Sequence, residues 1–110
     1  MSTDRELLSL AAKAAGLELV WHNWNGVPGD ETYPHIIFSG EMMSWNPLQS
    51  DADALRLAGE LLLSVSIDSG YTVVIDQHER TTYEAAHGLV ATRRAIVRAA
   101  AEIGRGMASK

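Results

Sequence analysis

The sequence predicts an α+β fold, in which helices are layered with a mainly antiparallel four-stranded sheet. Three segments repeat apolar residues at helical spacing, and two pairs of strand-like runs are each separated by turn residues. The resulting order is α-β-β-α-β-β-α within a single domain, residues 1–110. Because three helices do not fit comfortably on one face of four strands, we expect helices on both faces, as in an α/β/α sandwich.

The chain contains no internal repeat, low-complexity tract or interdomain linker. The predicted elements are a helix over residues 3–15, strands over 17–24 and 33–39, a helix over 50–62, strands over 64–68 and 71–77, and a helix over 89–107.

Turn and capping residues set the limits of the first three elements. Ser2 or Thr3 is suited to cap the first helix, and Gly16 stops it. The next residues alternate as a strand, and a long turn with Asn25-Gly26 and Pro28-Gly29 follows. Gly40 ends the second strand.

The segment WNPLQSDADALRLA has the features of a loop that turns into a helix. Pro47 favours an extended residue before it, and Ser50 or Asp51 accepts the free amide groups of a first turn. Asp53 adds negative charge at the positive end of the helix dipole. The apolar residues that follow recur at helical spacing and predict one buried face.

The third and fourth strands form a hairpin around Ser69-Gly70. Alternation predicts two faces for this hairpin. Val65, Ile67, Val73 and Ile75 are expected in the core, and Thr72, Val74 and Asp76 in solvent.

The last helix is predicted to be the longest. Thr81 and Glu84 have capping-box spacing, so an earlier helical turn is expected before Gly88. Within the main helix, Arg94, Arg98 and Arg105 fall on the side opposite the apolar arc. Glu102 is spaced to pair with Arg98. The alanine-rich arc permits close packing on a sheet.

Composition narrows the class of protein. There is no cysteine, which excludes disulfides and thiolate chemistry, and the 46% apolar fraction is that of a globular domain. No apolar run approaches the about 20 residues of a membrane span. The N-terminus lacks a secretory signal pattern, so we expect a cytoplasmic protein without a membrane partner.

Charge is distributed unevenly. Residues 1–88 carry 13 acidic and 4 basic side chains, a net charge of −9, whereas residues 89–110 carry 5 basic and 1 acidic, a net charge of +4. The cationic helix either docks on its own acidic body or offers a surface to an anionic partner.

Two segments carry a family resemblance. WNPLQSDADALRLA and the closing ATRRAIVRAAAEIGR together resemble the phage ABA sandwich domain family, small phage and prophage proteins of unknown function. The resemblance implies an α/β/α layered fold, a phage or prophage origin and a bacterial host. It implies no activity, catalytic residue or cofactor. Gly59 departs from the family pattern, in which a branched apolar residue is expected.

Several residues are candidates for interaction. Arg94, Arg98 and Arg105 are suited to phosphate neutralisation in nucleic acid, or form a solvated helix face. Trp24 and Trp45 are suited to anchor a protein interface, or to pack in the core.

Catalysis and metal binding have weaker support. His22, His35, His78 and His87 show no metal-ligand spacing, and no catalytic residue, metal site or cofactor is predicted. The favoured hypothesis is a non-enzymatic phage-derived factor that binds a protein. Alternatives are a nucleic-acid-associated factor, and a small ligand-binding domain or hydrolase. A homodimer through an edge strand or the alanine-rich helix is a further option.

Overall fold

The computed structural model describes residues 3–22, 33–86 and 88–108. It confirms the α+β class, but the observed order is α-β-β-β-α-β-β-β-α. The predicted order is wrong because it lacks the third and the sixth strand. The elements are α1 (Asp4–Ala14), β1 (Glu18–His22), β2 (Tyr33–Phe38), β3 (Glu41–Ser44), α2 (Asp51–Glu60), β4 (Ser64–Ile67), β5 (Thr72–Ile75), β6 (Thr81–Glu84) and α3 (Leu89–Ala108).

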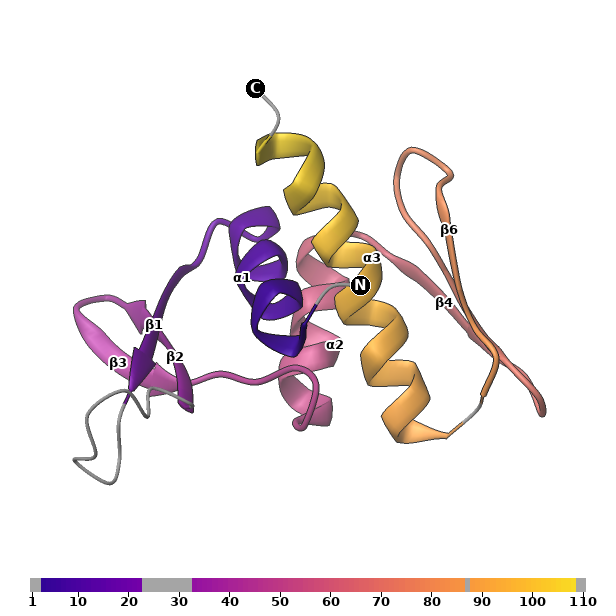
Figure 1. Ribbon diagram of the computed structural model, residues 1–110, viewed down its shortest axis with the longest axis horizontal. Coiled ribbons are helices and arrows are strands. Elements are labelled where there is room, and N and C mark those ends of the chain that lie inside the picture. The colour runs from indigo at the N-terminus through magenta and orange to yellow at the C-terminus, as the bar shows by residue number, and fades with distance from the viewer. Residues whose placement is uncertain (1–2, 23–32, 87, 109–110) are drawn as a thin grey trace.

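The strands form two separate three-stranded antiparallel sheets, not one four-stranded sheet. Strands β1–β3 make the N-terminal sheet and β4–β6 the C-terminal sheet. Figure 1 shows the helices between the two sheets, with α3 running diagonally through the centre. The predicted α/β/α layering is therefore wrong, since the helices form the middle of the molecule. A unit of one helix and three strands occurs twice before α3, although no sequence repeat indicates it.

The helices of both units have the same kind of N-cap and the same kind of C-terminal stop. The side chains of Thr3 and Ser50 each accept a hydrogen bond from the N–H of the third helical residue. Gly16 (φ 71°) and Leu62 (φ 53°) follow the two helices in left-handed conformation. In each case the next N–H reaches back to a carbonyl of the last turn, at 2.9 Å. The chain then leads directly into β1 or β4.

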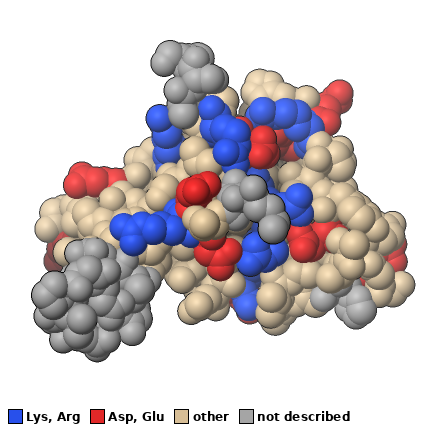
Figure 2. Space-filling model, viewed as in Figure 1, with Lys and Arg blue, Asp and Glu red and all other residues tan. Residues whose placement is uncertain are grey.

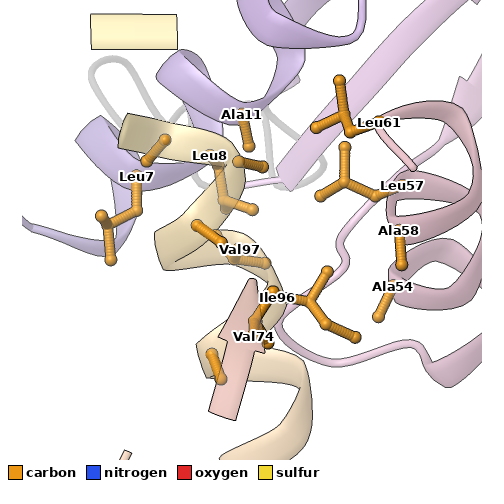
Figure 3. Packing of buried hydrophobic residues seen from close by; sticks show 14 of the residues in the cluster. Leu7, Leu8, Ala11, Ala54, Leu57, Ala58, Leu61, Val74, Ile96 and Val97 are labelled. Atoms are coloured by element: carbon orange, nitrogen blue, oxygen red, sulfur yellow. The ribbon is translucent and has the colours of Figure 1, made fainter. Parts of the chain in front are cut away.

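Helix α3 is the centre of the core. Figure 3 shows Ile96 and Val97 among side chains from α1, α2 and β5. The alanine-rich surface, considered above for a homodimer, is therefore occupied by the protein's own elements. Helical spacing predicts Leu89 and Met107 on the apolar arc of this helix, but they are 62% and 44% exposed near its ends. The buried hydrophobic residues of α3 are Ala91, Ala95, Ile96, Val97, Ala99, Ala100 and Ala101.

Strand β5 faces the opposite way from the prediction, whereas Val65 of β4 packs against the core as expected and pairs with Val74. Thr72, Val74 and Asp76 are buried, whereas Ile75 and Ile67 are exposed. Both faces of β5 carry β-branched residues, so alternation alone does not identify the inner face. The packing of α3 against the face that contains Val74 decides it.

Strand β6 occupies the segment expected to begin a helix. Thr81 pairs with Ile75, and Glu84 pairs with Thr72 across the ladder. The predicted capping box is therefore wrong. A run of two threonines and a tyrosine favours a strand, and pairing with β5 is available as soon as the chain turns back.

Candidate functional site

The three predicted arginines are brought together by the fold. Arg94, Arg98 and Arg105 line one side of a hollow of about 440 Å³, named here the arginine groove. The prediction that they share one face is confirmed. The groove lies where α1, α3 and β6 meet, and its other lining residues are Leu7, Thr82, Glu84 and Glu102.

Each arginine of this groove meets a carboxylate. Arg94 Nη2 lies 3.1 Å from Asp4 Oδ1, and Arg98 Nη1 lies 2.6 Å from Glu84 Oε2. Glu102 pairs with Arg105 at 3.3 Å, so the predicted pair of Glu102 with Arg98 is wrong. Figure 2 shows basic residues (blue) and acidic residues (red) intermixed over the middle of the face that it draws. The groove is thus close to neutral and does not present a continuous surface for a polyanion.

Arg98 has a structural role besides its ion pair. Its Nη1 also donates to the carbonyl oxygen of Tyr83 at 3.0 Å. The Asp76 N–H donates to Arg80 O, so the backbone groups of Arg80 point toward the strand that contains Asp76. Because the direction alternates along an antiparallel ladder, the backbone groups of Tyr83 point away from β5. Arg98 therefore covers part of the outer edge of the C-terminal sheet.

Arg93 was not among the predicted interaction residues. Of the arginines that form salt bridges within the described residues, it has the least exposed side chain. Its side chain is 16% exposed. Its Nε donates to Leu48 O at 2.9 Å and its Nη1 to Asp51 Oδ1 at 2.5 Å. These bonds fasten the loop before α2 to the first turns of α3. The sequence contains no local signal for this contact, because the partners are more than 40 residues apart.

The two tryptophans within the described residues, Trp21 and Trp45, contribute to the packing of the core. Trp45 is only 5% exposed and belongs to the core cluster, so it is not an exposed anchor. Trp24, the other predicted anchor, lies outside the described residues. Trp21 is half-buried, and the guanidinium carbon of Arg5 lies 4.3 Å from its ring centroid, which ties α1 to β1.

The histidines are not gathered into a site within the described ranges. His35 is buried in β2 and His78 is exposed after β5, while the side chains of His22 and His87 lie outside the described part. No group of three or more potential metal ligands occurs among the described residues.

The carboxylate of Asp76 organises the turn between β5 and β6. It accepts hydrogen bonds from the N–H groups of His78 and Arg80, at 2.8 and 3.0 Å, and from Arg80 Nε at 2.8 Å. Burial alone raises the pKa of Asp76, but these donors outweigh it and hold the pKa below its ordinary value. A carboxylate fully occupied by such donors is structural, and it is not available as a general base.

A mostly apolar hollow lies between the N-terminal sheet and α2. This apolar cleft has a volume of about 600 Å³, within the about 300–1,000 Å³ typical of ligand sites. Trp45 forms part of its wall, although the ring belongs to the core. Phe38 is 59% exposed and Met43 42% exposed at the same cleft. The lining residues are Ala15, Leu17, Ile36, Phe38, Met43, Trp45, Arg56, Leu57 and Glu60.

A tight hairpin places the exposed side chains at this cleft. Ser39 (φ 53°) and Gly40 (φ 79°) both adopt left-handed conformation between Phe38 and Glu41, which pair directly. A two-residue turn with both φ values positive matches the right-handed twist of the strands that it joins. Sequence reasoning missed β3 and with it the cleft. The Ser-Gly dipeptide was the available signal, the same dipeptide that predicted the later hairpin.

No family model, curated protein or solved structure matches this chain. Within the described ranges, none of the helices combines the length and the apolar character that crossing a membrane requires.

Proposed function

We propose that this chain is a non-enzymatic, phage- or prophage-derived accessory protein that binds a partner protein through the apolar cleft. The observation that carries the proposal is the exposure of Phe38 and Met43 beside an unfilled apolar hollow. Clustered exposed apolar side chains around a hollow are typical of interaction sites, and methionine adapts to differently shaped partners. The phage origin and the bacterial host rest on the family resemblance alone.

The experiment is capture from bacterial lysate with the full chain and two matched variants. Phe38→Asp places a charge at the cleft, whereas Val90→Asp places one on an apolar residue that is at least as exposed and does not line it. We expect a stoichiometric protein that is retained by the native chain and Val90→Asp but lost with Phe38→Asp. Equal capture by all three chains contradicts the proposal.

A nucleic-acid-associated role is the alternative, and its support is the convergence of three arginines in one groove. It predicts that captured material disappears after nuclease treatment and that Arg94→Ala with Arg98→Ala weakens the salt dependence of binding. The carboxylates opposite each arginine make this the lesser candidate. A hydrolase or ligand-binding role would have to use the cleft, whose lining holds only Arg56 and Glu60 as charged groups.

A further inference from the structure

We infer that the partner segment binds in extended conformation, adding a strand to the free edge of β3 while its alternate side chains enter the apolar cleft. This inference rests on the proposed protein-binding function. It specifies the form of the partner: a linear segment with apolar residues at every second position.

The backbone of β3 supports this arrangement first. The Trp45 N–H donates to Pro34 O at 3.2 Å, so the backbone groups of Trp45 point toward β2. In an antiparallel ladder this direction alternates along the strand, so the backbone groups of Met43 and Glu41 also point toward β2. The N–H and C=O groups of Met42 and Ser44 point the other way, out of the sheet edge. Within the described residues no strand pairs with that outer edge. An unpaired edge of this kind is a template for another extended chain.

The side chains of β3 connect this edge to the cleft. Met43 lines the cleft and pairs with Ile36, another lining residue, on the same face of the sheet. An added strand would continue this row, so every second side chain would lie over the cleft, opposite α2. The wall formed by α2 carries Arg56 and Glu60, which have opposite charges. Net charge therefore does not select the partner, and main-chain bonds with apolar side chains carry the recognition.

The two outer edges of the C-terminal sheet differ from the edge of β3. On β6, Arg98 donates a hydrogen bond to the outward-facing carbonyl oxygen of Tyr83. On β4, the outward residues are Val65 and Ile67, since Asp68 bonds to Tyr71 across the ladder. No β4 residue lines the apolar cleft, so β4 supplies a control edge without a hollow beside it.

The test uses a display library of random linear 12-residue peptides, selected on the native chain, and three variants. Met42→Pro removes an outward N–H while leaving the bonds to β2 in place, because proline is tolerated on an edge strand. Ile67→Pro makes the same change on β4. Phe38→Asp tests the cleft itself. Circular dichroism confirms that each variant retains the native fold.

We expect selected peptides to show apolar residues at alternate positions. Their affinity should fall about five- to tenfold or more with Met42→Pro and with Phe38→Asp, and stay within about twofold with Ile67→Pro. N-methylation of successive peptide bonds should weaken binding at alternate positions only. The loss of affinity expected for Met42→Pro corresponds to one or two main-chain hydrogen bonds.

Other outcomes overturn the inference in distinguishable ways. Sensitivity to Phe38→Asp without sensitivity to Met42→Pro means that the cleft binds a helix or a compact surface, which retains the proposed function and rejects strand addition. A native chain that sediments as a dimer, and as a monomer after Met42→Pro, identifies the occupant as a second copy. A selection that yields no peptide sensitive to Phe38→Asp rejects the extended segment as ligand.

Discussion

Gly104 of α3 lies directly against the backbone of Leu10 of α1. A Cβ atom at Gly104 would overlap the Leu10 carbonyl oxygen and lie 2.8 Å from its carbonyl carbon. The backbones of the two helices approach each other at this point because glycine has no side chain. The contact between α1 and α3 is the most extensive between any two elements described, so this position controls the central packing of the molecule.

Gly104→Ala is expected to destabilise the protein by about 2–4 kcal/mol, because backbone atoms of α1 cannot move aside as a flexible side chain can. Alanine normally favours a helix over glycine by about 1 kcal/mol. Gly59→Ala in α2 is the matched control, since nothing lies within 4 Å of the added carbon, and it should stabilise. Urea unfolding of the two variants measures both effects. A stabilising Gly104→Ala contradicts the close approach.

Trp45→Ala should cost about 3–5 kcal/mol of unfolding free energy, as for other large buried aromatic side chains. The reason is that Trp45 is 5% exposed and joins the N-terminal sheet to the helical core. Trp21→Ala, at a half-buried position, should cost distinctly less. Denaturant midpoints at constant slope provide the comparison. A loss at Trp45→Ala as small as that of an exposed side chain would contradict its place in the core.

Arg98→Met is expected to lower the free energy of unfolding by about 1 kcal/mol and to increase hydrogen exchange in β6. The methionine side chain keeps the apolar stem but gives up the bonds to Tyr83 O and Glu84. The estimate is modest because the Arg98 side chain is partly solvent-exposed. Arg105→Met, which loses a surface pair with Glu102, should change stability by less than about 0.5 kcal/mol. Unaltered exchange in β6 would refute the edge-covering role.

Asp76 should make stability depend on pH in the acid range. Its pKa in the folded state lies below the ordinary value, so its stabilisation is complete above the unfolded pKa of about 3.9. That contribution disappears as the pH falls through the lower folded pKa. Asp76→Asn should cost about 1–2 kcal/mol at pH 7 and flatten the decline below about pH 4. Unfolding series between pH 2 and 7 test this, with Asp4→Asn, in an exposed pair, as control.

Local sequence signals determined the helices well. The caps Thr3 and Ser50, the stop at Gly16 and the loop before α2 were all predictable, because each depends on residues within one or two turns. The common face of Arg94, Arg98 and Arg105 was predictable for the same reason, since helical spacing alone places them together.

The tertiary structure decided what those elements do. β5 carries β-branched residues on both faces, so only contact with α3 shows that Val74 is inside. Arg98 was expected to be a solvated or ligand-binding group, and its long-range bond to Tyr83 makes it part of the sheet edge. The sequence by itself determined where α1 and α2 begin and end, since capping and spacing are local. The layering, the inner faces and the cleft were decided by tertiary packing, because they depend on contacts between residues distant in the chain.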